Sequence, residues 1–418
     1  MPKSNAKIVS AFAFCNLANL IRVLGVVAAK TMSAANGNVV IAGGGVMGSA
    51  CAYFLHTNPD FRGSITVVEP DPSYVYAASA RSASSIRQQF STPINIALSA
   101  FGLQFLRQAE LRSAVSLVES SYLYLATSAG LSTLEQRCAV QRSSEVPVTL
   151  RDRAQLAQRY PWLATSDLAA GSDTVGAEGW FDGYALLSAL RGANERGGVA
   201  YLRDRVVAFE RSHDGAIVAA TLQQHGSLSC NSAVIAAGTR SRDLADGVGV
   251  DLPVFARKRT VFVFTCPVAI SGCPLVVDPS GLWFRPEGDR FLCGVPANPD
   301  PNVSPNDFEI DHGLFESIAW PILAQRVPAF EAVRVTSAWA GHYDYNVFDQ
   351  NAYVGLVPEI PNLLLASGFS GHGLQHAPGI GRGLAEQIIF GEYRSIDLTP
   401  LSYERFLAEE PLRELNVI

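Results

Sequence analysis

A short glycine-rich loop near the beginning of the chain has the residue types and spacing that hold a dinucleotide. Residues 43–48 read Gly-Gly-Gly-Val-Met-Gly, which matches the GxGxxG pattern. Gly43 allows a tight turn, Gly45 lets the backbone approach a pyrophosphate, and Gly48 lets a helix pack closely on a strand. Glu69 follows 21 residues after Gly48, where a carboxylate can accept hydrogen bonds from ribose hydroxyls. The acid argues against a 2′-phosphate, but the motif does not separate NAD from FAD.

A second glycine-containing loop lies near the end of the chain. Residues 368–375 read Gly-Phe-Ser-Gly-His-Gly-Leu-Gln and precede a predicted helix that reaches about Phe390, with Pro378 in its first turn. Glycines let the backbone lie against a ligand, and helix N-terminal amides stabilise negative charge. A reduced flavin carries such charge near its N1 and C2 oxygen, so amides here would favour hydride acceptance. His372 is equally consistent with a turn residue that caps its own loop.

The elements that must position these loops form a βαβ unit and additional strands. Residues 38–42 and 64–69 are predicted strands, and residues 49–57 between them are a predicted helix. The apolar runs 233–237 and 362–367 predict two further strands. Three separated segments therefore build one nucleotide-binding sheet, and this context makes the glycine motif much more specific than a lone GxGxxG.

The composition predicts a globular enzyme-sized chain. It has 418 residues, 48% of them hydrophobic and 17% charged, which is enough for two domains. The net charge of −6 argues against a nucleic-acid partner. Seven cysteines occur without a CxxC pair, which gives no support to a metal site or a redox dithiol. Cys266 and Cys273 bracket a short loop and could pair, although reduced thiols are the favoured interpretation.

The first 35 residues differ from the rest, because they are basic and no acid occurs before Asp60. This pattern favours a mitochondrial presequence. A secretory signal and a membrane anchor are alternatives, but Arg22 within residues 8–29 would cost about 2.5 kcal/mol in the centre of a bilayer. A start of translation at Met32 would remove the segment altogether. Elsewhere no apolar run is long enough to predict a transmembrane helix.

These motifs together resemble the D-amino-acid oxidase superfamily of FAD-dependent oxidoreductases, in its glycine and sarcosine oxidase branch. The resemblance rests on the loop at 43–48 with Glu69, on AVIAAG at 233–238 and on GFSGHGLQ at 368–375. Longer strings resemble a narrower group of this family, mitochondrial oxidoreductases that act as assembly factors for respiratory complex I. They are SIRQQFSTPINIALS (85–99), GWFD (179–182), VVDPSGLWFRPEG (276–288), VPAFE (327–331), SAWAGHYDYNVFDQN (337–351) and GFSGHGLQHAPGIGR (368–382).

The resemblance implies where FAD binds. Gly43, Gly45 and Gly48 would hold the pyrophosphate, and Glu69 the adenosine ribose. Ser79 and Ser82 would line the flavin side of the FAD, and the backbone of Val206 would meet the adenine. The loop beside the flavin would consist of Gly371, His372, Gly373, Leu374 and Gln375.

Two departures from the family concern the covalent link. The cysteine that tethers FAD in sarcosine oxidases is replaced by His342, and residues 77–91 lack the histidine that dimethylglycine dehydrogenases use. We therefore predict non-covalent FAD, with a histidyl link through His342 as the alternative.

Candidate catalytic residues are His342, Lys258, Arg285 and Tyr345. His342 and Tyr345 are candidates for the walls of a dry cavity over the flavin, although core packing explains the tyrosine nearly as well. Lys258 is the only lysine after Lys30. It could guide oxygen near flavin N5, but the interpretation as a chance surface lysine is slightly favoured.

Two further observations concern the substrate carboxylate. Arg285 could bind it in a bidentate manner, and a surface salt bridge is equally consistent. The lysine that clamps the carboxylate in sarcosine oxidases is replaced here by Gln375, and the arginine of glycine oxidases is displaced. Both changes weaken the expectation of amino-acid oxidase activity.

We expect a two-domain α/β flavoprotein. A Rossmann-like FAD domain would comprise residues 36–95, 176–245 and 350–392, and a cap domain with an antiparallel sheet residues 96–175 and 246–349, followed by a tail at 393–418.

Two functions follow from the resemblance, an oxidase or dehydrogenase of a small amine or amino acid and an assembly factor. We predict an FAD-dependent oxidoreductase that acts in complex I assembly, in the mitochondrial matrix or on the matrix face of the inner membrane. Its partners would be complex I subunits or other assembly factors, with peripheral membrane association. A cytoplasmic location is the alternative if the chain is bacterial.

Overall fold

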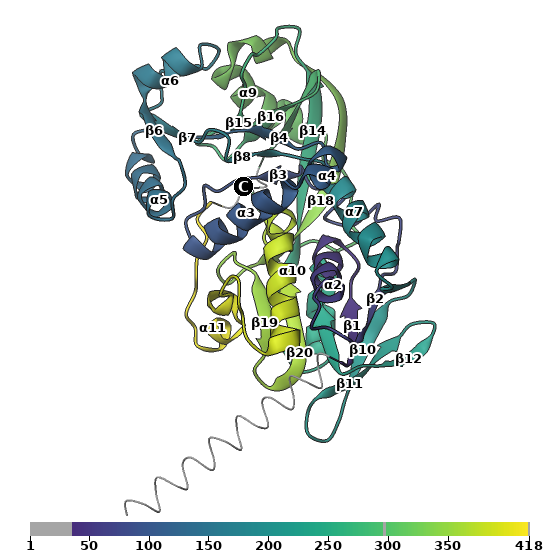
Figure 1. Cartoon of the computed structure of the whole chain (residues 1–418). Helices are drawn as coiled ribbons and strands as arrows, with labels where there is room; N and C mark the ends of the chain where they lie inside the picture. The colour runs from purple at the N-terminus through teal and green to yellow at the C-terminus, as the bar shows by residue number, and fades with distance from the viewer. Residues whose placement is uncertain (1–35, 296–297, 417–418) are drawn as a thin grey trace, which may run out of the picture.

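The computed structural model describes residues 36–295 and 298–416, which form two sheet-based halves (Figure 1). The predicted targeting segment and Met32 lie outside the described residues. Within the described ranges, no helix is long and apolar enough to cross a membrane.

The lower half in Figure 1 is built on a six-stranded sheet. Its order is β19 (Tyr353–Val357), β20 (Ile360–Ser367), β13 (Ser232–Ile235), β1 (Asn38–Ala42), β2 (Ser64–Val68) and β9 (Ala200–Leu202). The strands pair in parallel, except that β19 is antiparallel to β20. Runs such as Val39–Ala42 are apolar throughout because parallel strands are buried on both faces.

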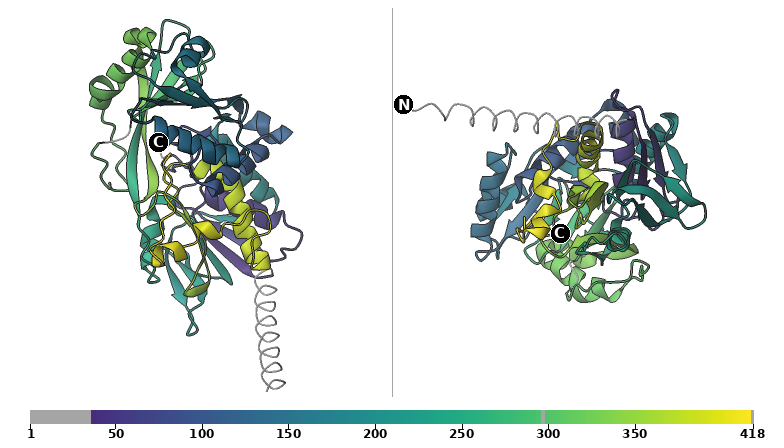
Figure 2. Two further views of the ribbon diagram at one scale, coloured as in Figure 1. Left: turned by 90° about the vertical axis from the view of Figure 1, so that its left-hand side faces the viewer. Right: turned by 90° about the horizontal axis from the view of Figure 1, so that it is seen from below.

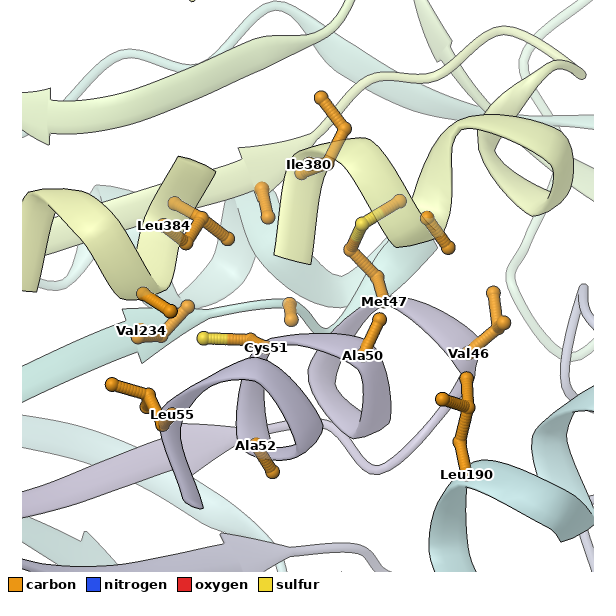
Figure 3. Packing of buried hydrophobic residues seen from close by; sticks show 14 of the residues in the cluster. Val46, Met47, Ala50, Cys51, Ala52, Leu55, Leu190, Val234, Ile380 and Leu384 are labelled. Carbon is orange, nitrogen blue, oxygen red and sulfur yellow. The ribbon is translucent and has the colours of Figure 1, made fainter. Parts of the chain in front are cut away.

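Helices cover one face of this sheet and a small sheet covers the other. On one face, α2 (Val46–His56) packs between α10 (Gly373–Phe390) and α7 (Gly183–Arg196), and α3 (Pro93–Leu106) packs on α10. Figure 3 shows Ala50 and Cys51 of α2 facing Ile380 and Leu384 of α10. On the other face lie α8 (Ser241–Asp246) and the sheet β10 (Val206–Arg211), β11 (Ile217–Leu222) and β12 (Gly226–Ser229).

The upper half contains an eight-stranded sheet. Its order is β18 (Arg334–Asn346), β14 (Val254–Thr265), β17 (Arg290–Gly294), β16 (Trp283–Glu287), β15 (Leu275–Val277), β5 (Tyr122–Ala126), β7 (Ala170–Asp173) and β6 (Thr149–Asp152). All neighbours are antiparallel except β15 and β5. Its core is aromatic, with Phe262, Phe264, Phe284 and Phe330 fully buried.

Shorter elements complete this half and its junction with the lower one. They are α4 (Ala109–Ala114), α5 (Leu131–Ser143), α6 (Arg153–Arg159), α9 (Trp320–Arg326) and the small sheet of β3 (Ser85–Ile86), β8 (Glu178–Trp180) and β4 (Val118–Ser120).

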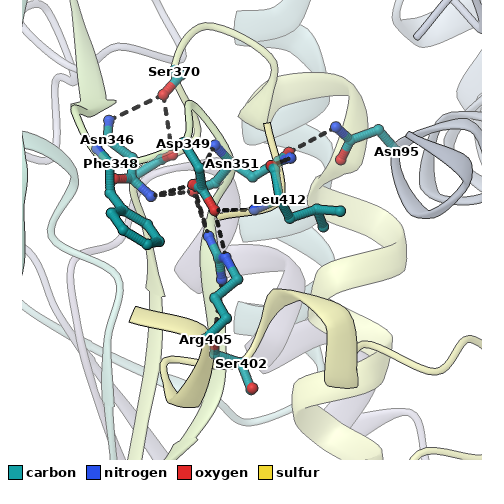
Figure 4. Close-up of polar contacts among 10 residues, drawn as sticks. Asn95, Asn346, Phe348, Asp349, Asn351, Ser370, Ser402, Arg405 and Leu412 are labelled. Carbon is teal, nitrogen blue, oxygen red and sulfur yellow. Dashed lines mark hydrogen bonds and ion pairs between the residues drawn. The ribbon is translucent and has the colours of Figure 1, made fainter. Parts of the chain in front are cut away.

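The C-terminal segment runs from α11 (Glu404–Leu407) in the lower half to the junction with the upper half (Figures 1 and 2). It is anchored by Arg405, whose guanidinium forms a buried ion pair with Asp349, at 2.7 Å between Nε and Oδ2. Figure 4 shows that Asp349 also accepts hydrogen bonds from Asn346, Asn351 and Leu412. The predicted tail is therefore integrated into the fold.

Several sequence predictions are confirmed and one is wrong. The strands at 38–42, 64–69, 233–237 and 362–367 correspond to β1, β2, β13 and β20 within a few residues. Pro378 lies inside α10 rather than in its first turn, because the helix begins at Gly373. Proline has no N–H, so the carbonyl of Leu374 receives no bond from residue 378.

The remaining predictions about chain organisation have different outcomes. The predicted domain boundary after residue 95 falls inside α3, which begins at Pro93, and the division itself stays a prediction. All six cysteines in the described ranges are free thiols, including Cys266 and Cys273. In that part of the chain no cluster of three or more His, Cys, Asp or Glu side chains could hold a metal ion.

Candidate functional site

A cavity of about 1040 Å³ lies where the two halves meet. The lower half contributes residues at the carboxyl ends of β1 and β2, among them Gly43, Gly45 and Glu69, and the upper half contributes Tyr122 and His342. Ligands bind at this edge in open parallel sheets, and a volume of roughly 1000 Å³ is at the upper end for small-molecule sites. The cavity is therefore large enough for an extended cofactor.

The glycine loop forms one end of the cavity. Gly43 has a φ of +106°, and a Cβ atom there would lie 2.3 Å from the carbonyl oxygen of Ala236. A Cβ atom at Gly48 would lie 1.9 Å from the carbonyl oxygen of Gly43, so only glycine lets the helix pack this closely on the loop. Gly48 itself does not line the cavity. At Gly45 the nearest atom would be Ser79 Oγ at 3.4 Å, which leaves the space before Gly45 open.

The N-terminus of α2 faces this open space without a side-chain cap. Its N-cap residue is Gly45, and the first intrahelical bond runs from the amide of Ser49 to the carbonyl of Gly45. Ser79 Oγ accepts the amide of Val46 at 3.2 Å. The amides of Met47 and Gly48 have no intrahelical acceptor, so they can bind an anion.

Glu69 lies beside this loop at the end of β2. Its two carboxylate oxygens accept the amide of Gly44 at 2.8 Å and the amide of Asp71 at 2.9 Å. Burial raises the pKa of Glu69, and the two backbone hydrogen bonds oppose that rise. The bond to Gly44 places Glu69 at the same end of the cavity as the glycine loop, and Val206 of β10 also lines the cavity.

The second loop forms the part of the wall between β20 and α10. Gly371 has a φ of +92°, and a Cβ atom there would lie 2.4 Å from the ring of Tyr343. One carboxylate oxygen of Asp344 accepts the amides of Gly368 and Phe369 at 2.8 and 3.2 Å. Burial raises the pKa of Asp344 to about 6. The amides of Gly373 and Leu374 start α10 without a side-chain cap and can bind a partial negative charge.

The comparison with known proteins identifies the family. A family model described as "FAD dependent oxidoreductase" (DAO) matches residues 38–387. The chain belongs to this family of FAD-dependent oxidoreductases.

Relatives and solved structures agree with this assignment. "FAD-dependent oxidoreductase domain-containing protein 1" from Xenopus laevis is 39% identical, over 91% of this chain and 85% of the relative. "4-methylaminobutanoate oxidase (formaldehyde-forming)" from Paenarthrobacter nicotinovorans is 27% identical, over 88% of this chain but only 45% of the relative. The L-proline dehydrogenase from P. horikoshii has the same fold, with a TM-score of 0.79 at 21% identity over 90% of this chain and 99% of that one. Glycine oxidase from Geobacillus kaustophilus has a TM-score of 0.74 at 22% identity, over 88% of this chain and 98% of that one.

FAD is therefore the cofactor, and the residues of the cavity fit it. Gly45 and the uncapped start of α2 would hold the pyrophosphate, Glu69 the ribose, and the start of α10 the flavin. The wall contains most of the residues that the sequence assigned to FAD, namely Gly43, Gly45, Glu69, Ser79, Ser82, Val206, Gly371, His372, Gly373, Leu374 and Gln375.

The side chains of the second loop have mainly structural contacts. The ring of His372 packs against Phe90 and His376, with centroids 5.5 and 5.1 Å away. Burial, with a smaller effect of Arg87, lowers the pKa of His372 to about 3, so its ring is neutral at pH 7. Gln375 Oε1 accepts the amide of Arg87 at 2.8 Å. Neither ring nitrogen of His372 has a hydrogen-bond partner among the described residues, so the neutral ring as well as the loop backbone can contact the flavin.

Of the four candidate catalytic residues, His342 lines the cavity. Its Nε2 lies 2.7 Å from the carbonyl oxygen of Asp307, its ring is 4.4 Å from that of Phe308, and burial lowers its pKa. The hydrogen bond to a carbonyl requires a proton on Nε2, which opposes an attachment of FAD through that atom.

Lys258, Arg285 and Tyr345 do not line the cavity in the part of the chain that the structure describes, and their role in catalysis stays a prediction. Lys258 Nζ binds both carboxylate oxygens of Asp307, at 2.8 and 2.9 Å. The guanidinium of Arg285 is buried and contacts Glu287 and the carbonyl of Ala83. The ring of Tyr345 lies under the guanidinium of Arg257, 4.8 Å away. Each of these side chains has a structural partner instead.

The sequence reasoning missed Arg87, a buried wall residue that follows β3. Its guanidinium donates to the carbonyl of Asn416 and lies 4.4 Å above the ring of Phe90. Among the described residues, no carboxylate oxygen lies within 4 Å of it, and its Nε has no hydrogen-bond partner. A signal was available, because Arg87 is the only charged residue between positions 82 and 106.

Proposed function

We propose that this FAD-dependent oxidoreductase oxidises a small amine or amino acid that carries a carboxylate. The observation that supports this substrate class is Arg87, a buried guanidinium in the cavity wall without a carboxylate partner within the described ranges. A buried charge is costly unless it is paired, and a guanidinium fits a carboxylate in a bidentate manner. FAD supplies the acceptor for a hydride from the carbon next to the nitrogen.

The protein's contribution is to orient the substrate and to exclude water. Arg87 would hold the carboxylate, and the aromatic side chains of Tyr122, Trp283, Tyr343 and Phe308 would surround the rest of the substrate. Aromatic walls exclude water and strengthen the ion pair with Arg87. His342 is neutral at pH 7 because burial lowers its pKa, which suits a substrate whose amine must lose its proton before oxidation.

A comparison of acids with their amides tests this substrate class. Matched pairs such as N-methylglycine and N-methylglycinamide, or proline and prolinamide, are mixed anaerobically with the purified holoprotein, and flavin bleaching is followed. The acid of a reactive pair should bleach the flavin much faster than the amide, and Arg87→Gln should remove that preference. Equal rates for acid and amide in the wild type would overturn the proposal.

We also propose that the chain acts in the assembly of respiratory complex I in mitochondria. The support is the resemblance of the strings at 85–99, 276–288 and 337–351 to the mitochondrial assembly-factor group. Complex I subunits or other assembly factors would then be its partners, at the matrix face of the inner membrane.

Complementation tests this second role. Cells in which the gene for this chain is inactivated should have less assembled complex I on native gels, and the wild-type chain should restore it. Gly45→Glu, which blocks the pyrophosphate site by size and charge, shows whether FAD is needed for that rescue. Normal complex I in the inactivated cells would exclude the role.

A further inference from the structure

The segment around Arg87 is held by buried polar groups from distant parts of the chain. Glu178 of β8 accepts the amides of Gln88 and Gln89 at 2.8 and 3.0 Å. On the other side, Glu414 accepts the amide and the hydroxyl of Ser91 at 2.9 and 2.7 Å. Arg87 thus lies on a short stretch of backbone that two buried carboxylates fix.

The C-terminal segment makes several hydrogen bonds to this stretch and to the start of α3. The carbonyl of Asn416 accepts from the Arg87 guanidinium, and Asn416 Nδ2 donates to the carbonyl of Gln89 at 2.7 Å. Glu414 Oε2 accepts from Thr92 Oγ1 at 2.9 Å and from Asn95 Nδ2 at 3.0 Å. Glu414 and Asn416 are 1% and 3% exposed, so these contacts are shielded from water.

Glu414 supplies a negative charge near Arg87 without occupying its guanidinium. Although burial raises the pKa of Glu414, hydrogen bonds from Ser91, Asn95 and Asn416 outweigh that effect and leave the pKa below its usual value. The carboxylate is therefore ionised at pH 7. Its oxygens are taken up by these donors, and no ion pair of 4 Å or less joins it to Arg87 in the described part of the chain.

This arrangement offsets the cost of burying a cation and keeps it available. Direct pairing of Arg87 with a protein carboxylate would compete with an incoming substrate carboxylate. A carboxylate held a short distance away lowers the cost of burial by Coulomb attraction, which is strong at low dielectric. One N–H of Arg87 is fixed by the carbonyl of Asn416, and the guanidinium has further N–H donors for a ligand.

We propose that the C-terminal segment Leu412–Asn416 supports the substrate site from outside the cavity wall, with Glu414 and Asn416 as positioning residues for Arg87. The inference rests on the proposed function, because it assigns to Arg87 the binding of a carboxylate. It predicts that changes in this segment weaken carboxylate binding while the FAD site, formed by the loops at 43–48 and 368–375, keeps its cofactor.

The test measures binding of unreactive carboxylates to the holoprotein. Acetate, propanoate and butanoate are titrated against the flavin absorbance spectrum of the wild type, Glu414→Gln, Asn416→Ala and Glu410→Gln. Glu410 is an exposed residue two positions before this segment, so Glu410→Gln is the matched control for the charge change. FAD content and dithionite reduction are measured for each variant.

Glu414→Gln should raise the Kd for the carboxylates by about tenfold or more, because it removes the negative charge that stabilises the buried cation. It also places the NH₂ group of the new amide among side chains and amides that donate hydrogen bonds to Glu414. Asn416→Ala, a milder change that keeps the backbone carbonyl, should raise the Kd by a smaller factor, and Glu410→Gln should leave it unchanged. FAD content should stay at the wild-type level in all four proteins. If Glu414→Gln did not fold, the Asn416→Ala result would decide.

The outcomes separate this inference from the proposed function. Carboxylates that fail to perturb the wild-type flavin spectrum contradict the proposed function itself. Carboxylates that bind the wild type, Glu414→Gln and Asn416→Ala equally contradict only the positioning role. A rise in Kd in Glu410→Gln as large as in Glu414→Gln would also contradict it, because the effect would then be one of net charge.

Discussion

The glycines of the first loop have separable effects on FAD binding and on folding, which Gly45→Ala and Gly48→Ala distinguish. A Cβ atom at Gly45 would make only an ordinary contact with Ser79 Oγ at 3.4 Å, and alanine adopts its φ of −60° without strain. A Cβ atom at Gly48 would lie 1.9 Å from the carbonyl oxygen of Gly43. Gly45→Ala should therefore obstruct the cavity and leave the fold intact, whereas Gly48→Ala should disturb the loop itself.

The expected magnitudes follow from the contacts that each methyl group removes. In Gly45→Ala the methyl group stands between the loop and the pyrophosphate, so at least one amide–phosphate hydrogen bond is lost. Hydrogen bonds to charged groups contribute about 1.5–3 kcal/mol, which corresponds to roughly 10- to 150-fold in the Kd for FAD. The unfolding free energy of the apoprotein should change by less than about 1 kcal/mol. Gly48→Ala should lower it by about 1–3 kcal/mol through overpacking.

Two measurements on the apoprotein test these values. FAD is titrated in and flavin fluorescence gives the Kd, and urea denaturation gives the unfolding free energy. Gly249→Ala serves as control, because Gly249 has a φ of +83° with no atom within 4 Å of an added Cβ. The control should lose some stability and keep its FAD affinity. A wild-type Kd in Gly45→Ala, or equal losses of stability in Gly45→Ala and Gly48→Ala, would refute the reasoning.

Three further changes have defined outcomes. Arg405→Met leaves the carboxylate of Asp349 buried without its cation, so urea denaturation should show a loss of about 3–5 kcal/mol, and a loss below about 1 kcal/mol would contradict that. Burial raises the pKa of Asp344 to about 6, so the folded state binds more protons than the unfolded state between about pH 4 and 6. This group's contribution to the unfolding free energy should therefore fall by about 2–3 kcal/mol as pH rises through that window, and Asp344→Asn should remove the fall relative to wild type. Because Lys258 pairs with Asp307 outside the cavity wall, Lys258→Met should change the rate of flavin reoxidation by oxygen by less than about twofold, and a tenfold change would restore Lys258 as a site residue.

The sequence was most informative where local chemistry determines the structure. The positive φ of Gly43 and the close approach at Gly48 allow only glycine, so the motif predicts its own conformation. Apolar runs such as 38–42 similarly predict buried parallel strands, because a sheet covered on both faces needs them.

Whether a candidate catalytic side chain reaches the cavity was less predictable, because it depends on which face of a long strand the side chain occupies. On β14, Arg259 lines the cavity and its neighbour Lys258 does not, and adjacent strand residues point to opposite faces. The string Arg-Lys-Arg contains no signal for that choice. Arg87 and Glu414 were missed for another reason, since they lie 327 positions apart and their proximity depends on the tertiary fold.

An anaerobic absorbance scan tests most directly whether the protein transfers electrons from a substrate to its FAD. Small N-methyl and α-amino acids are added in turn to the purified holoprotein, with dithionite as control, and absorbance is followed near 450 nm, where flavins typically absorb. We predict bleaching by at least one acid that carries a carboxylate next to its amine. A flavin that every acid leaves oxidised and only dithionite reduces would contradict the account and favour FAD as a stabiliser of the fold.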